Sequence, residues 1–124
     1  MKQFLILLLL GGAFPLTGQV TDAFQELSDR YRTEFWGHWN NQEYDAAQAF
    51  LLRMHTAYYS LPKEGKSLHR SEMANVCYNL ACAYSLNEQP EKSFFHLDQA
   101  VANGFNDFQM IKEKDDLAYL RIQP

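Results

Sequence analysis

The sequence predicts an all-α protein, in which antiparallel helical hairpins are followed by a short C-terminal capping helix. Three observations lead to this fold class. Apolar residues recur every three or four positions through most of the chain, polar or Gly/Pro-containing breaks divide these stripes, and no stretch alternates with a period of two for long. The length of 124 residues allows one domain.

The first hairpin is predicted from two apolar stripes that a polar break separates. A helix from about Thr21 to Asn40 carries the stripe Phe24, Leu27, Tyr31, Phe35 and His38. A second helix, which ends near Ser60, carries the stripe Tyr44, Ala47, Leu51, Met54 and Tyr58. Pro62 and Gly65 then predict a loop before the next helix.

The second hairpin follows the same plan. Its first helix is predicted from Ser67 to Leu86 and carries the stripe Met73, Cys77, Leu80, Ala81 and Tyr84. Pro90 suits the first turn of the following helix, because the N–H that proline lacks needs no partner there. Asn103-Gly104 predicts the end of that helix, since Gly104 can adopt the left-handed conformation of a C-cap and Phe105 can fold back onto the last turn.

The remaining C-terminal residues predict a cap on the last hairpin. Asn106 or Asp107 can begin a short helix that runs through Ile111. Leu117 and Leu120 are expected near the end of a terminal packing segment.

The two predicted hairpins align with each other at a shift of 46 residues, which indicates an internal repeat. The shift places Tyr31 on Cys77, Phe35 on Ala81, His38 on Tyr84, Ala47 on Ser93, Leu51 on Leu97 and Met54 on Ala100. A helix pair of this kind cannot bury its apolar face alone, so the pairs are expected to stack. Two repeats are fewer than the three usually needed, so we expect the C-terminal cap or self-association to add stability.

The second hairpin resembles a tetratricopeptide repeat. The likeness is carried by Leu80, Ala81, Tyr84, Ser93 and Ala100. Cys77 departs from the bulky residue that usually begins the motif, and Phe105 departs from its closing proline. The resemblance implies an α-solenoid of about two repeats.

The first hairpin is less similar to the repeat, because Tyr44 and Ala47 fit the pattern while Glu34 and His38 do not. The tail GFNDFQMIKEKDDLAYLR is similar to the closing segment that follows the last repeat in exported bacterial proteins of this type. The resemblance covers about residues 28–120. It specifies a fold and carries little information about function.

The first 19 residues have the pattern of a secretory signal peptide. Lys2 precedes an apolar run from Phe4 to Leu16, which is shorter than the roughly 20 residues that span a bilayer. Cleavage near Gln19 would leave residues 20–124 as the helical repeat domain; an uncleaved anchor and a buried helix starting at Met1 are the alternatives. The stretch Leu16-Thr17-Gly18-Gln19 resembles a lipoprotein box, but Gln19 stands where the lipidated cysteine must be. The sequence therefore predicts a periplasmic or secreted protein that is not inserted in a membrane after signal removal.

Composition and spacing argue against several functions. With 11 Lys and Arg against 15 Asp and Glu, the chain lacks the basic excess of a nucleic-acid binder. There is no glycine-rich phosphate loop and no Gly-x-Ser-x-Gly turn. None of the four histidines is spaced from another His or Cys in the way that metal ligands usually are; they are His38, His55, His69 and His96. We therefore expect no metal, no cofactor and no enzymatic activity.

The two cysteines are expected to be buried packing residues. Cys77 and Cys82 lie in one predicted helix and point about 140° apart around its axis, so a disulfide between them would break the helix. An enzyme that pairs one of these thiols with a histidine is an alternative. Their mid-helix positions, away from a helix N-terminus that would favour the thiolate, argue against it.

The first helix of each tetratricopeptide hairpin lines a concave groove, and the resemblance implies the binding residues of this chain. The candidates are Arg32, Trp36, Trp39, Asn40, Asn75, Tyr78 and Ser85. Trp, Tyr and Arg are enriched at binding hot spots, and Asn can hydrogen-bond a peptide backbone. Alternatively, Trp36 and Trp39 pack beneath the next hairpin or the C-terminal segment.

The function expected from these features is that of a non-enzymatic adaptor, which binds a peptide or protein partner in the groove. The alternative is an exported glycan or small-molecule binder, in which groove aromatics stack on the ligand.

Overall fold

The computed structural model of the chain describes residues 23–123, and every regular element in this range is a helix. The all-α prediction is therefore confirmed for these residues. The predicted signal peptide and the predicted helix start at Thr21 lie outside the described range. Within that range, no helix is both long and apolar enough to cross a membrane.

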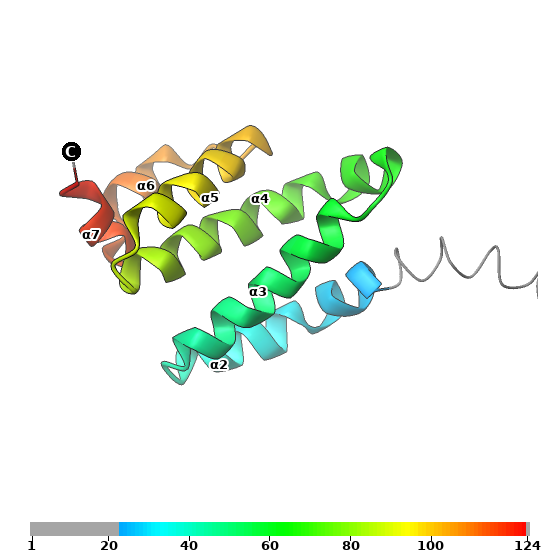
Figure 1. Cartoon of the computed structure of the whole chain (residues 1–124), viewed down its shortest axis with the longest axis horizontal. Coiled ribbons are helices and arrows are strands. Elements are labelled where there is room, and N and C mark those ends of the chain that lie inside the picture. Colours follow the sequence, from blue (N-terminus) through cyan, green and yellow to red (C-terminus); the bar gives the residue numbers. More distant parts are fainter. Residues whose placement is uncertain (1–22, 124) are drawn as a thin grey trace, which may run out of the picture.

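The first helical segment runs from residue 23 to residue 40 and contains one irregular turn. Residues 23–30 are α-helical, Tyr31–Phe35 forms a π-helical turn, and α2 (Trp36–Asn40) completes the segment. Helix α3 (Tyr44–Tyr59) then returns beside it (Figure 1). Both helices match the two apolar stripes of the first predicted hairpin.

A long central helix organises the molecule. Helix α4 (Lys63–Leu86) packs against α3 and also against α5 (Pro90–Ala102), which lies along it (Figure 1). Pro90 occupies the first turn of α5, as its missing N–H predicts. Most of the buried side chains of α4 belong to the core that these helices share.

The predicted start of α4 at Ser67 is wrong by four residues. The helix begins at Lys63, directly after Pro62, whose extended backbone (φ −65°, ψ 166°) ends the loop. Gly65 therefore lies inside the first turns of α4 and does not mark a loop. A Cβ at Gly65 would come within 3.3 Å of Leu61 Cβ, so the glycine allows the helix to approach the buried Leu61 side chain closely.

The two turns within the helix pairs have the same backbone structure. Gln42 (φ 61°) and Glu88 (φ 56°) are both left-handed, and they are 46 residues apart. The N–H of Gln42 donates to Trp39 O (3.0 Å) as that of Glu88 does to Ser85 O (3.0 Å). The next N–H groups donate in the same register, Glu43 to His38 O and Gln89 to Tyr84 O, at 2.8 and 2.9 Å. The sequence shift thus corresponds to a repeated backbone conformation.

Glycine at either left-handed position is expected to stabilise the protein. The left-handed conformation is unfavourable for residues with a Cβ, and glycine removes this cost while adding entropy to the unfolded chain. We expect Gln42→Gly and Glu88→Gly each to raise the free energy of unfolding by about 0.5–1 kcal/mol, measured by urea denaturation. Asn41→Gly is the control, because Asn41 has an ordinary φ of −88°, and it should not stabilise. Lower stability of both glycine variants would contradict the shared turn geometry.

The paired core positions are also buried alike in three cases. No side-chain surface is exposed at Phe35 and Ala81, at Ala47 and Ser93, or at Met54 and Ala100. Ser93 Oγ donates to Ala81 O at 2.6 Å, which satisfies the buried hydroxyl between α5 and α4.

The C-terminal residues fold back over the second helix pair. Gly104 has a φ of 105°, and the N–H of Phe105 donates to Ala100 O at 2.9 Å, which is the predicted C-cap of α5. Asp107 caps α6 (Phe108–Glu113) by accepting from the N–H of Met110 at 3.0 Å. A 3-10 turn (Asp115–Leu117) and α7 (Ala118–Arg121) follow. As predicted, this terminal segment packs: Leu117 and Leu120 are buried, and their elements contact α4 and α5.

Candidate functional site

A hollow of about 270 Å³ lies where the first helical segment, α4 and the C-terminal segment meet. We call it the Trp36 hollow. Its lining residues are Tyr31, Trp36, Asn75, Tyr78, Asn79, Phe105 and Met110. Four are aromatic, and the two amides supply polar groups among them. Small-molecule sites are usually about 300–1,000 Å³, so this hollow suits one large side chain better than an extended ligand.

The π-helical turn sets the wall formed by the first segment. Phe35, at the end of this turn, is fully buried. Its ring stacks on Tyr31 (centroids 5.2 Å apart, 6° between planes) and meets Trp36 edge-on at 4.8 Å. The buried ring therefore holds the two residues that border the hollow. Single π-turns inside α-helices are frequent at functional sites.

Tyr31 and Asn79 close the inner end of the wall. Asn79 Nδ2 donates to the Tyr31 hydroxyl oxygen, which joins the first segment to α4. Burial, together with the nearby Glu72 carboxylate, raises the pKa of Tyr31 to about 12 against an ordinary value near 10. The phenol is therefore uncharged at neutral pH and offers an apolar face with a satisfied polar tip.

The raised pKa of Tyr31 should make the free energy of unfolding vary with pH in the alkaline range. The unfolded chain loses the Tyr31 proton near pH 10 and the folded chain near pH 12, so the folded state binds more protons in this window and stability falls as pH rises. Below pH 10 this contribution is fully present. In Tyr31→Phe, the free energy of unfolding should fall less steeply between pH 10 and 12 in urea titrations. Tyr59→Phe, at a ring 41% exposed, is the control; equal slopes for wild type and Tyr31→Phe would contradict the effect.

The C-terminal segment forms the opposite wall. The ring of Phe105 stacks on Tyr78, with centroids 4.5 Å apart and planes 7° apart. Phe105 thus folds back through its backbone onto α5, as predicted, while its ring covers α4. The Tyr78 hydroxyl is buried without a hydrogen-bond partner, and burial raises its pKa. The chain's own tail therefore covers part of the surface that α4 would otherwise offer.

A second hollow, of about 370 Å³, continues along α4 and shares Asn75, Phe105 and Met110 with the first. Its remaining lining comes from Ser71 and Ala74 of α4 and from the turn between α5 and α6. Asn75 is exposed between the two hollows, where its amide can bond to a passing backbone. The two hollows together form a groove with an aromatic end and a polar end.

Of the seven residues predicted to bind a partner, the structure brings Trp36, Asn75 and Tyr78 together in the Trp36 hollow. Arg32 is exposed but does not line it, and Asn40 is exposed at the end of α2. Tyr78 contributes a ring face only, since it is 3% exposed.

Trp39 and Ser85 lie away from this hollow. Trp39 packs against the rings of Phe35 (5.6 Å) and Tyr44 (5.0 Å), which belong to its own hairpin, whereas Trp36 is 38% exposed. Ser85 is fully buried, and its hydroxyl has no partner.

Four lining residues were missed by sequence reasoning. Phe105 and Met110 come from the segment interpreted as a cap, and only its return over α4 brings them to the site. Tyr31 was assigned to the core stripe, and nothing in the sequence indicated Asn79 as a binding residue. A signal for the Tyr31–Asn79 pair was absent, because the two residues are far apart in sequence and meet only through packing.

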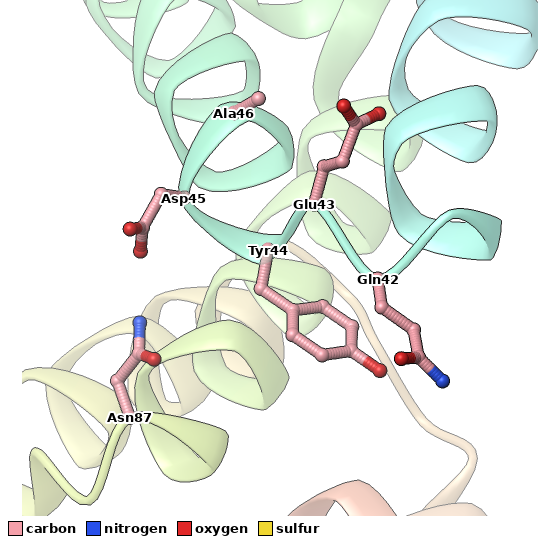
Figure 2. Close-up of a pocket in the computed structure, with 6 residues that line it drawn as sticks. All are labelled: Gln42, Glu43, Tyr44, Asp45, Ala46 and Asn87. Atoms are coloured by element: carbon pink, nitrogen blue, oxygen red, sulfur yellow. The ribbon is translucent and has the colours of Figure 1, made fainter.

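Another hollow, of about 450 Å³, lies at the turn between α2 and α3 and near the end of α4. Figure 2 shows the side chains of Glu43, Tyr44 and Asp45 pointing in different directions, so no group of polar atoms converges there. This open surface is therefore a weaker candidate for a binding site than the Trp36 hollow.

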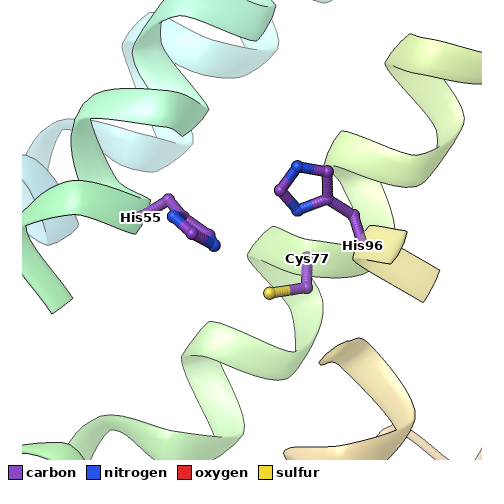
Figure 3. Close-up of side chains that lie close together, drawn as sticks. All are labelled: His55, Cys77 and His96. Atoms are coloured by element: carbon purple, nitrogen blue, oxygen red, sulfur yellow. The ribbon is translucent and has the colours of Figure 1, made fainter. Parts of the chain in front are cut away.

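The cysteine thiols are buried in α4 and form no disulfide. Burial raises the pKa of Cys77 and of Cys82 to about 12, which keeps both as thiols near neutral pH and lowers their reactivity as nucleophiles. Among the described residues, the side chains that could together hold a metal ion are His55, Cys77 and His96, which meet between α3, α4 and α5 (Figure 3). Spacing did not reveal this group, because each member comes from a different helix.

Comparison with known proteins gives no match to a protein family, to a curated protein sequence or to a solved structure.

Proposed function

We propose that this protein is an exported, tetratricopeptide-like repeat module that binds a peptide or protein partner non-covalently and catalyses no reaction. Support for the repeat comes from the two turns around Gln42 and Glu88, which share their left-handed residue and hydrogen bonds at the 46-residue shift. The C-terminal segment, in which Leu117 and Leu120 are buried, covers apolar surface that two repeats alone would leave exposed.

The observation that carries the binding proposal is the partly exposed Trp36 ring at the edge of an aromatic hollow. Trp36 borders about 270 Å³ of space next to the exposed Asn75 amide. A large apolar side chain of the partner would fill the hollow, and Asn75 would bond to the backbone beside it. Aromatic anchors in pockets of this kind contribute much of the energy of many interfaces.

The size and shape of the site favour a peptide over a glycan. Of the two tryptophans, Trp36 is the more exposed, since Trp39 packs against Phe35 and Tyr44. A single ring in a small hollow suits one inserted side chain, whereas stacking along an oligosaccharide needs a longer aromatic platform.

A test is the selection of short peptides from a random display library against the purified protein, followed by affinity measurement. We expect selected peptides to share one large apolar residue, and Trp36→Ala to weaken their binding about 10-fold or more. Phe94→Ala is the matched control, because Phe94 on α5 is 40% exposed, much like Trp36 at 38%. Equal binding by both variants would contradict the site, and tight binding of oligosaccharides alone would support the glycan alternative.

A further inference from the structure

Three potential metal ligands converge from three helices on one point outside the Trp36 hollow. His55 lies on α3, Cys77 on α4 and His96 on α5, and one ligand atom from each lies within 4.8 Å of the others. Figure 3 shows both rings and the sulfur directed toward the space between the helices. A cluster of this kind is a stronger signal than exposed acidic groups, because two of its members, Cys77 and His96, are buried polar side chains.

The cluster contains a buried polar atom that the protein does not satisfy. His96 is 6% exposed, and its Nδ1 has no hydrogen-bond partner. Buried ring nitrogens are normally paired, so an unpaired one calls for an explanation such as an absent ion.

A fourth polar group lies at the same place. Gln99 Oε1 is 2.9 Å from His55 Nε2 and 3.9 Å from Cys77 Sγ. Since an amide oxygen only accepts, His55 Nε2 carries the proton of the bond to Gln99. The amide oxygen is therefore placed to orient the His55 ring.

Aromatic side chains pack against both imidazole rings. Tyr84 stacks on His96 with centroids 5.3 Å apart and planes 5° apart, and Tyr59 packs against His55 at 4.7 Å. The two histidines meet edge-on at 5.2 Å. The buried, stacked His96 ring therefore loses little freedom on binding an ion, whereas the half-buried His55 ring can still rotate.

We propose that His55, Cys77 and His96 bind one copper(I) ion, with Gln99 Oε1 orienting the His55 ring through its hydrogen bond. Metal–sulfur and metal–nitrogen bonds of about 2.3 and 2.0 Å place the ligand atoms of a trigonal site roughly 3.5–3.7 Å apart. The present separation of up to 4.8 Å therefore needs a contraction of about 1 Å. Rotation of the half-buried His55 side chain can supply it.

The charge of the site favours a monovalent ion. Binding of the ion releases one proton to the solvent, that of the Cys77 thiol. Both imidazole rings remain neutral. His55 keeps its proton on the ring nitrogen that does not bind the ion. One thiolate and one copper(I) ion then give no net charge, whereas zinc(II) would leave a buried net charge of +1. Thiolate and imidazole both suit copper(I), and structural zinc usually has four strong ligands.

The test is an anaerobic titration of the purified protein with copper(I) in competition with a chromogenic chelator. We expect one ion per chain and copper–sulfur and copper–nitrogen distances by X-ray absorption. Since the ion binds only the folded state, the unfolding temperature should also rise. Cys77→Ser, His55→Gln and His96→Gln should each weaken binding about 100-fold or more.

Cys82→Ser is the matched control, because Cys82 is also buried in α4 but lies outside the cluster, and it should bind copper(I) as the wild type does. Circular dichroism of each variant checks folding; if Cys77→Ser unfolds, the half-buried His55→Gln carries the test. Equal affinity of wild type and His55→Gln, or equal loss in Cys82→Ser, would overturn the site. Binding of zinc(II) in preference to copper(I) at these residues would overturn the choice of ion.

Discussion

Phe35→Ala is expected to lower the free energy of unfolding by about 3–5 kcal/mol, as removal of a fully buried phenylalanine generally does. The Phe35 ring has no exposed surface and touches the rings of Tyr31, Trp36 and Trp39. Alanine would leave a cavity at the π-helical turn and free the two aromatic residues that border the Trp36 hollow. Urea denaturation followed by circular dichroism measures the stability loss.

The same substitution should weaken peptide binding, because Tyr31 and Trp36 depend on Phe35 for their positions. Phe94→Ala removes a ring of the same size from an exposed position on α5 and should change stability by no more than about 0.5 kcal/mol. A similar effect of the two substitutions would contradict the assignment of Phe35 to the core.

Leu117→Ala is expected to cost about 2–5 kcal/mol, the range for a buried leucine. Leu117 is 1% exposed, and its 3-10 turn packs on α4. The segment that contains it follows Phe105 and Met110, which form the outer wall of the Trp36 hollow. If the tail is an integral part of the fold, its loosening should lower the unfolding midpoint of the whole domain in one transition.

Ile122→Ala provides the comparison, since Ile122 is 77% exposed near the end of the described chain and should be close to neutral. A Leu117→Ala protein with wild-type stability would show that packing of the C-terminal segment does not stabilise the helix pairs.

Much of the fold follows from local sequence patterns. The apolar stripes located α3, α4 and α5, because one buried face of a helix requires this spacing. Pro90, Gly104 and Asp107 marked helix ends through backbone properties that need no tertiary information. Gly65 misled the prediction, because its role is a close approach to Leu61 and not a turn.

The candidate sites were less predictable, because they depend on which residues packing brings together. Trp36, Asn75 and Tyr78 were identified from their helix positions, but Phe105 and Met110 reach the hollow only through the return of the tail. The cluster of His55, Cys77 and His96 draws one residue from each of three helices, so no spacing within a helix could indicate it. The π-helical turn at Tyr31–Phe35 had no sequence signal that we recognised.

The most direct test of the central claim, that the Trp36 hollow receives an apolar side chain of a partner, is nuclear magnetic resonance of the ¹⁵N-labelled protein titrated with the tightest selected peptide. We expect saturable shifts at the Trp36 indole N–H and the side-chain amides of Asn75 and Asn79. Shifts confined to the outer side of α5, around Phe94 and Phe95, would contradict it.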